Sequence, residues 1–105
     1  MLGVFGIINA KRNIKQIEEK AALLKAISHP IRLCIVTGLM SDKGCNVSKI
    51  KGCLKLPQST VSQHLSKLKS AGIVEGRRNG LEVNYYVVNE EVREIIDCLN
   101  ITKFN

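Results

Sequence analysis

Short polar side chains crowd into one stretch of the chain, which carries Ser59, Thr60, Ser62, Gln63 and His64. Their hydroxyl, amide and imidazole groups offer both donors and acceptors of hydrogen bonds. Groups of this kind reach base edges and phosphate oxygens, and they are short enough to let a helix enter the major groove of DNA. The stretch therefore predicts contacts with nucleic acid, although an ordinary solvated helix face has the same composition.

A basic run, Arg77-Arg78-Asn79-Gly80, follows the polar stretch and could bind phosphate groups or the minor groove beside it. Positive charge gathers around both features, because Glu75 is the one acid between Lys43 and Arg78. The basic residues of that region are Lys43, Lys49, Lys51, Lys55, Lys67, Lys69, Arg77 and Arg78. The side chains expected to contact DNA are Gln58, Ser59, Thr60, Ser62, Gln63, His64, Lys67, Lys49, Arg77, Arg78 and Asn79, with Lys51 adding charge at the flank.

Length and composition narrow the class of protein. A chain of 105 residues has room for one domain, here residues 1–105, and buries only a modest core without a partner. Its 16 basic residues against 9 acidic ones give a net charge of +7, which suits a phosphate polyanion. No apolar run approaches the roughly 18 residues of a membrane span, and no secretory signal is evident, so we expect a cytoplasmic protein without a membrane segment.

Helices must position these side chains, and the apolar spacing indicates where they lie. The predicted helices are Ile14–Ile27, a second that starts at Pro30 and runs through Leu39, Val47–Leu54, residues 58–71, and a last helix that begins after Asn89. His29 is expected at the start of the second helix, and Asn46 is suited to cap the third. Gly72 is placed to end the fourth helix, which carries the polar stretch. Residues 1–13 are interpreted as an N-terminal extension.

The pattern changes to alternation after Gly72, and residues 73–88 predict a β-hairpin around an Asn79-Gly80 turn. Two short helices joined by the tight Lys55-Leu56-Pro57 connection precede it, and the second helix carries the polar stretch. A helix-turn-helix followed by a basic hairpin is a specific architecture. The sequence therefore predicts a mainly α fold, a winged helix-turn-helix with about five helices and a two-stranded wing.

The residues that carry this architecture resemble the ArsR/SmtB family of winged-helix repressors. The matching segments are Ser28-His29-Pro30-Ile31-Arg32-Leu33, Leu56-Pro57-Gln58-Ser59-Thr60-Val61-Ser62-Gln63-His64-Leu65-Ser66-Lys67-Leu68, Ala71-Gly72-Ile73-Val74, Arg77-Arg78-Asn79-Gly80 and Tyr85-Tyr86. The resemblance spans roughly residues 14–99. It implies a sequence-specific repressor that binds an inverted-repeat operator in double-stranded DNA, with 58–71 as its recognition helix.

The resemblance also implies a homodimer whose interface is formed by the first and last helices. The apolar residues of the two helices favour the same arrangement independently, because a chain this small cannot cover both stripes. They are Ile17, Leu24 and Ile27 on the first helix and Val92, Ile95, Ile96 and Leu99 on the last. A two-fold dimer would set two recognition helices one turn of DNA apart, about 34 Å.

Release from the operator is the third property that the resemblance implies, through thiol oxidation or metal binding. The sulfide- and redox-responsive branch of the family uses one cysteine from the second helix and one from the last, which makes Cys34 and Cys98 the candidates here. Cys34 lies about one turn, and Cys98 about two turns, before the positions usual in that branch. A lone cysteine in an apolar helix is also simply a small buried hydrophobe. Cys45 and Cys53 are the next candidates.

A repressor that responds to a thiophilic metal is the alternative. The family's usual metal sites are not matched, because Asn46-Val47-Ser48 stands where Cys-Val-Cys is typical and no histidine follows His64. Cys45 and Cys53 could still supply thiolates, although they lack the close spacing of a Cys-x-x-Cys pair. No cofactor is certain.

Two other classes of protein compete with a DNA-binding repressor. An enzyme could pair Cys45 or Cys53 with His64, but the chain has no glycine-rich phosphate loop and no nucleophile elbow, so we expect no catalysis. A winged helix that binds RNA or protein instead of DNA is the second alternative.

Overall fold

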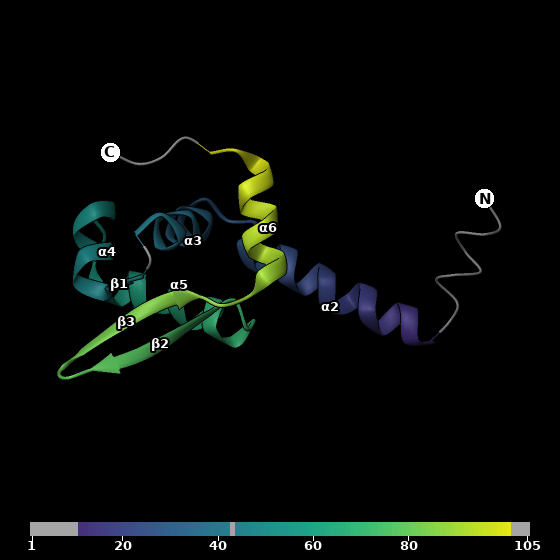
Figure 1. Ribbon diagram of the computed structural model, residues 1–105, viewed down its shortest axis with the longest axis horizontal. Helices are drawn as coiled ribbons and strands as arrows, with labels where there is room; N and C mark the ends of the chain where they lie inside the picture. Colours follow the sequence, from purple (N-terminus) through teal and green to yellow (C-terminus); the bar gives the residue numbers. More distant parts are fainter. Residues whose placement is uncertain (1–10, 43, 102–105) are drawn as a thin grey trace.

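The computed structural model describes residues 11–42 and 44–101. Its elements are the helices α2 (Lys11–Ile27), α3 (Pro30–Asp42), α4 (Val47–Leu54), α5 (Gln58–Ser70) and α6 (Glu90–Leu99), and the strands β1 (Cys45–Asn46), β2 (Val74–Asn79) and β3 (Glu82–Val87). The predicted order of helices and strands is confirmed (Figure 1). The first helix begins at Lys11 instead of Ile14, so the expected extension 1–13 lies mostly outside the described residues.

The hydrophobic core gathers residues from every helix and from the two long strands. α3 supplies its centre, since Val36 is fully buried and Leu39 is 2% exposed. The buried apolar side chains are Ile27, Ile35, Val36, Leu39, Ile50, Val61, Leu65, Leu68, Ile73, Val74, Val87, Val92 and Ile96. α5 therefore turns its apolar stripe inward, which leaves its polar stretch on the outer side.

Side-chain caps fix where three helices begin. Asn46 Oδ1 accepts the backbone N–H of Lys49 at 2.8 Å, and Asn89 Oδ1 accepts that of Val92 at 3.0 Å. His29 Nδ1 accepts the N–H of Ile31 at 3.1 Å in the first turn of α3. The predicted roles of Asn46, Asn89 and His29 as residues at helix starts are confirmed, because each satisfies a first-turn donor that has no partner within its helix.

The sheet has three antiparallel strands in the order β1-β3-β2, so the predicted two-stranded wing was incomplete. Cys45 pairs with Tyr85, and Asn46 pairs with Asn84. β1 escaped prediction because two residues directly before a helix carry no readable alternation. This strand joins the base of the hairpin to the start of α4.

The hairpin turn also differs from the expected Asn79-Gly80 turn. Asn79 pairs with Glu82, so the two turn residues are Gly80 and Leu81. Gly80 has φ +68, and Leu81 is not among the residues with positive φ. Glycine with positive φ at the first central position is typical of a type II′ turn, which matches the twist of the two strands.

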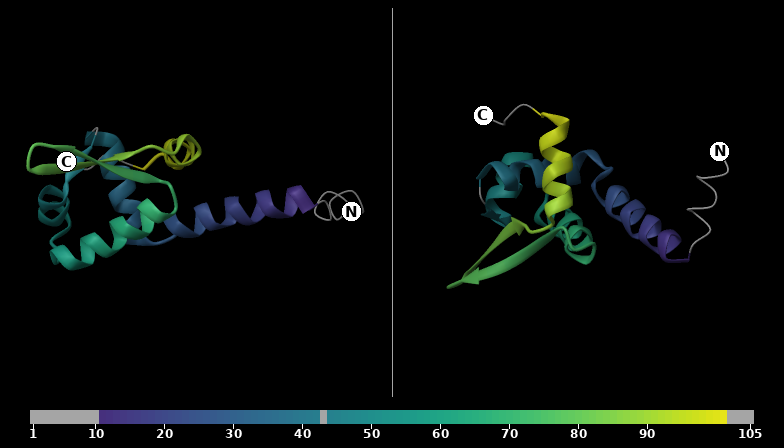
Figure 2. Two further views of the ribbon diagram at one scale, coloured as in Figure 1. Left: turned by 90° about the horizontal axis from the view of Figure 1, so that it is seen from below. Right: turned by 45° about the vertical axis from the view of Figure 1, so that its right-hand side comes forward.

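α2 projects from the body, and the rest of the chain packs at its C-terminal end (Figure 1 and Figure 2). Among its residues with described side chains only Ile27 is buried, and Lys20 forms an ion pair with Glu91 at the start of α6. Within the described ranges no single helix could cross a membrane by length and composition, although α2 and α3, bent by 90° at their junction, pass that test as a pair.

Candidate nucleic-acid interface

The outer face of α5 carries the polar residues that the sequence singled out. Gln58, Ser59, Ser62 and Gln63 are exposed, whereas Thr60 is half-buried. No side chain caps the helix, and its first turn contains no acidic residue. The positive end of the helix dipole is therefore free of a competing carboxylate. This face can donate and accept hydrogen bonds at the edge of a base pair.

The connection between α4 and α5 is tight because Lys55 takes the left-handed conformation, with φ 56 and ψ 44. Its backbone N–H donates to the carbonyl of Lys51 at 2.8 Å, which closes α4. Pro57 then stands before α5, and its carbonyl accepts the N–H groups of Thr60 and Val61. The pair of helices is the helix-turn-helix that the Lys55-Leu56-Pro57 connection predicted.

The tertiary structure brings α4, the N-terminal end of α5 and the tip of the hairpin to one end of the molecule, and α2 projects from the other end (left view of Figure 2). Lys49 and Lys51 on α4 are exposed, as is Lys67 on α5. A basic hairpin beside an exposed polar helix is the arrangement with which winged proteins bind a major groove and the adjoining backbone.

The two wing arginines differ in their surroundings. The Arg77 guanidinium lies 4.6 Å from the centroid of the Tyr86 ring, and its Nε donates to Glu75 Oε1 at 2.7 Å. Arg78 pairs in register with Val83 and has no partner among the described side chains. Successive residues of a strand point to opposite faces, so the two guanidinium groups cannot face the same surface. Asn79 is exposed at the end of β2.

A hydrogen bond joins the wing to the helix-turn-helix. Asn46 Nδ2 donates to Glu82 Oε1 at 3.1 Å, while Asn46 Oδ1 caps α4. One amide side chain therefore holds the first residue of β3 and the first turn of α4. The sequence showed the cap but not the bond to Glu82, because the partners lie 36 positions apart.

His64 lies on the half-buried side of α5, away from the exposed residues Ser62 and Gln63. Its Nδ1 is 3.4 Å from Arg32 Nη1, and its ring centroid is 4.7 Å from that of His29. Burial lowers the pKa of His64 below its ordinary value, and the nearby His29, Arg32 and Lys67 lower it further. Its imidazole is held neutral near pH 7.

Comparison with known proteins places this arrangement in a family. A family profile described as a helix-turn-helix domain matches residues 27–77. The transcriptional repressor PagR of Bacillus anthracis is 44% identical over 93 residues, which are 89% of this chain and 93% of PagR. Its crystal structure aligns with a TM-score of 0.77 at 46% identity, covering 83% of this chain and 99% of that one.

Two further solved structures agree. Reduced HlyU from Vibrio cholerae aligns with a TM-score of 0.79 at 32% identity, over 86% of this chain and 94% of HlyU. The homodimeric DNA-binding domain of Mb0332 from Mycobacterium bovis, described as a possible ArsR-family regulator, aligns with a TM-score of 0.77 at 26% identity, over 88% and 84% of the two chains. This chain belongs to the ArsR/SmtB family of winged-helix regulators.

The cysteines of this ArsR/SmtB protein are all free thiols in the structure. Cys34 on α3 is half-buried, and Cys98 on α6 is exposed. Burial raises the pKa of Cys34, and the nearby Cys53 thiol on α4 raises it further. Both causes disfavour the thiolate form of Cys34.

A metal site like those of other ArsR/SmtB regulators would need several donors close together. Among the described residues no three side chains of histidine, cysteine, aspartate or glutamate gather into such a group. Cys45 on β1 is half-buried, and Cys53 on α4 is exposed. Within the described part of one chain, the histidine, cysteine and carboxylate side chains do not form a donor set for a resident metal ion.

Sequence reasoning missed two groups that this ArsR/SmtB protein brings to the interface. Arg32 comes from α3 and lies 32 positions before His64, which it contacts, and no local pattern marks it. Tyr86 was assigned only to the hairpin, yet its ring holds Arg77. The signal that could have predicted the contact between Arg77 and Tyr86 was a basic residue and an aromatic residue on neighbouring strands.

Proposed function

We propose that this protein is a sequence-specific repressor of transcription that binds an inverted repeat in double-stranded DNA as a homodimer. The observation that carries the proposal is the exposed polar face of α5, with Gln63 at its middle, at the same end of the molecule as the basic wing. Relatives named as repressors, PagR among them, support the same function. α5 would read the major groove, and Arg78 would bind the neighbouring backbone.

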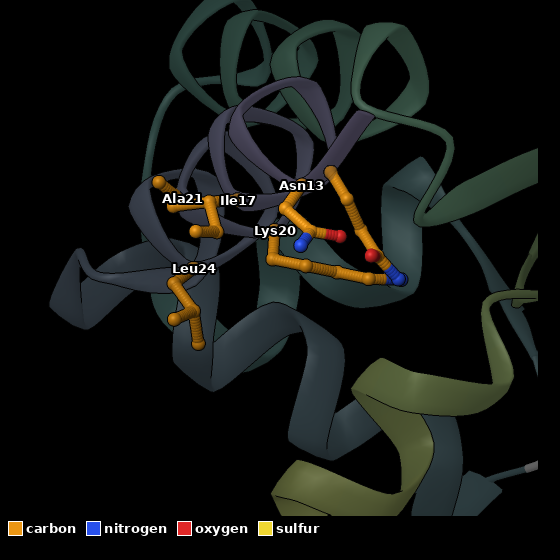
Figure 3. Close-up of a pocket in the computed structure, with 6 residues that line it drawn as sticks. Asn13, Ile17, Lys20, Ala21 and Leu24 are labelled. Carbon is orange, nitrogen blue, oxygen red and sulfur yellow. The ribbon is translucent and has the colours of Figure 1, made fainter. Parts of the chain in front are cut away.

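Unpartnered apolar residues on α2 support the dimer. Ile17 is 48% exposed and Leu24 is 50% exposed, and together with Ala21 they line a hollow of about 400 Å³ (Figure 3). A helix of 17 residues that buries so little of itself is only marginally stable in water. Leu99 on α6 is also exposed, with 51% of its surface uncovered. A second copy would cover both helices, as the homodimeric Mb0332 domain suggests.

Thiol chemistry is the input that we propose for release from DNA. Cys34 remains the central candidate, because it lies on α3, the helix that packs against α5, and the family resemblance implies that one of the two reacting thiols lies on this helix. Cys98 is the partner that the resemblance implies, and Cys45 and Cys53 are the next candidates. A peroxide would take two electrons and two protons from a pair of thiols, leaving a disulfide and water or an alcohol. A persulfide would do the same and leave as a thiol and hydrogen sulfide, and a second persulfide can insert its outer sulfur into the bridge and leave as a thiol. Either bridge would displace the helices that carry the two cysteines. Binding of a thiophilic metal by these cysteines is the alternative.

DNA binding is tested by titrating a duplex that carries an inverted repeat from the region upstream of the protein's own gene. The competitors are a scrambled duplex and an RNA of the same length, at physiological salt. We expect operator binding at least about a thousandfold tighter than binding to the scrambled duplex. Equal affinity for all three nucleic acids would contradict the repressor, and preference for the RNA would favour an RNA-binding winged helix.

The thiol input is tested on the operator complex with reduced protein, then with a persulfide, a peroxide and thiophilic metal ions. Mass spectrometry identifies the linked cysteines, and Cys34→Ser, Cys53→Ser and Cys98→Ser are compared. We expect Cys34→Ser to stay bound to the operator under oxidant. Of Cys53→Ser and Cys98→Ser, the variant that lacks the second thiol of the bridge should also stay bound. Release of all three variants by the oxidant would exclude these pairs, and release by metal alone would favour the alternative.

A further inference from the structure

Arg32 joins three segments that are distant in the sequence. It lies in the first turn of α3, and its Nε donates to the carbonyl of Ala26 in the last turn of α2 at 2.6 Å. Its Nη1 lies 3.4 Å from Nδ1 of His64 in α5. A planar guanidinium donates in two fixed directions, so this one side chain sets the end of α2 against the helix that carries the polar stretch.

The geometry fixes the protonation of both imidazoles. A guanidinium group can only donate, so His64 Nδ1 must accept from Arg32. His29 Nδ1 likewise accepts the backbone N–H of Ile31 at the start of α3. Each ring therefore carries its proton on Nε2. Protonation of His64 Nδ1 would place two donors face to face and break its contact with Arg32.

The charges around His64 all oppose a second proton. His29 from the α2–α3 connection, Arg32 from α3 and Lys67 from α5 itself lower its pKa, after burial, which is the largest cause. The two rings also lie 4.7 Å apart, so a charge on one opposes a charge on the other. Among the groups that shift this pKa there is no carboxylate to offset a positive charge.

We propose that Arg32 is a positioning residue for DNA recognition, and that its contact with His64 makes operator binding sensitive to acid. The inference rests on the proposed function of α5. At neutral pH the cluster sets α5 against α2, the helix through which the dimer forms, so it fixes how the two recognition helices are spaced. Protonation of His64 makes its Nδ1 a donor and breaks the contact with Arg32, which loosens α5 from the end of α2. The spacing of the two recognition helices then no longer matches one turn of DNA.

The direction in which operator affinity changes with pH distinguishes the effect of the cluster from that of added charge alone. Added positive charge on a DNA-binding protein tightens its binding to any duplex, so protonation of His64 would ordinarily raise affinity as the pH falls. The cluster predicts the opposite for the operator, which should bind roughly tenfold more weakly at about pH 5.5 than at about pH 7.5, the size of one lost charge-assisted hydrogen bond. Binding to a scrambled duplex should tighten over the same range.

The chain has 2 histidines in all, so two substitutions remove every imidazole. The double substitution His29→Asn and His64→Asn retains a neutral acceptor near each Nδ1 and leaves no imidazole to titrate. Its affinity for the operator should no longer weaken between about pH 7.5 and about pH 5.5. Arg32→Gln should bind weakly at both pH values. Arg93→Gln makes the same change of charge on α6, where Arg93 donates to the carbonyl of Val87, and should behave as the wild type.

The readouts are the dissociation constants for both duplexes at the two pH values, circular dichroism of each variant, and ¹⁵N spectra of the two imidazoles without DNA. The spectra should show both rings protonated on Nε2 at about pH 7.5, and His64 should titrate below its ordinary pKa of 6.5. Failure of the wild type to bind any duplex at about pH 7.5 would overturn the proposed function. Operator binding that is unchanged or tighter in acid, equal weakening of the variant without histidine, or a proton on Nδ1 of His64 would overturn the cluster alone.

Discussion

Arg77 and Arg78 are neighbours in the sequence but point to opposite faces of the wing, and only Arg77 is held by its own chain. Its guanidinium lies 4.6 Å from the Tyr86 ring and bonds to Glu75, whereas Arg78 has no partner among the described side chains. A held guanidinium must give up these contacts to bind a phosphate, so the two arginines should contribute unequally to DNA binding.

The first prediction follows from this difference. Arg78→Ala should weaken binding to every duplex and reduce the slope of log affinity against log salt concentration by about one. Arg77→Ala should change the slope less and should lower the stability of the hairpin, since the Tyr86 contact is lost. Fluorescence anisotropy over a series of salt concentrations measures both. If the double variant kept the wild-type affinity and slope, the wing would not touch DNA.

Gln63 should read sequence, because its exposed amide can donate and accept at one base edge. Gln63→Ala is expected to cost about 1–3 kcal/mol of binding free energy on the operator and little on random DNA. Lys69→Ala, an exposed residue of the last turn of α5, serves as the matched control. Equal losses on operator and random DNA would show that Gln63 does not read bases.

The dimer should depend on the apolar face of α2. Ile17→Asp with Leu24→Asp introduces charge on a surface that a second copy would bury, and we expect monomers by light scattering and weaker operator binding. Lys15→Asp changes charge on an exposed residue of the same helix and should leave the dimer intact. A double variant that remained dimeric would place the interface elsewhere.

Gly44 should tolerate no side chain. Its φ is +99, and an added Cβ would lie 2.4 Å from Cε1 of Tyr86. Gly44→Ala should lower the free energy of unfolding by roughly 1–3 kcal/mol, because it strains the backbone just before β1. Gly38→Ala is the control, since a Cβ in that part of α3 meets nothing within 4 Å. Urea unfolding compares the two, and a Gly44→Ala protein as stable as the wild type would contradict the contact.

Cys34 should react more slowly with an alkylating agent than the exposed cysteines. Its pKa is raised above the ordinary 9.0, so at about pH 8 less of it is thiolate, and it is half-buried where Cys53 and Cys98 are exposed. Timed alkylation with iodoacetamide, followed by peptide mass spectrometry, should label Cys34 last. The difference should narrow as the pH approaches about 10, because the thiolate fraction of Cys34 rises there. Faster labelling of Cys34 than of Cys98 would contradict this order.

The free energy of unfolding should fall in acid because of His64. The folded protein holds the pKa of His64 below its ordinary value, so the unfolded chain binds more protons as the pH drops through 6.5. The contribution of the neutral ring is present above that pH and is lost as the pH falls toward the lowered pKa. Urea midpoints between about pH 7.5 and pH 5.5 should decline in the wild type and decline less in His64→Asn.

The sequence by itself determined the helices, their caps and the polar face of α5. Helical spacing of Val61, Leu65 and Leu68 orients that helix, because burying the apolar stripe leaves the opposite side for solvent or DNA. Asn46 and Asn89 cap helices through bonds to residues three positions away, and such local bonds are readable from sequence.

Only the tertiary structure decided which distant groups meet. β1 exists because Cys45 and Asn46 find a partner strand 38 to 40 positions later, and two residues have no period of their own. The unequal wing arginines depend on the register of β2 and β3, which moved the turn from Asn79-Gly80 to Gly80-Leu81. Arg32, His29 and His64 meet because the core packs α3 against α5, and contacts set by packing leave no pattern in the order of the residues.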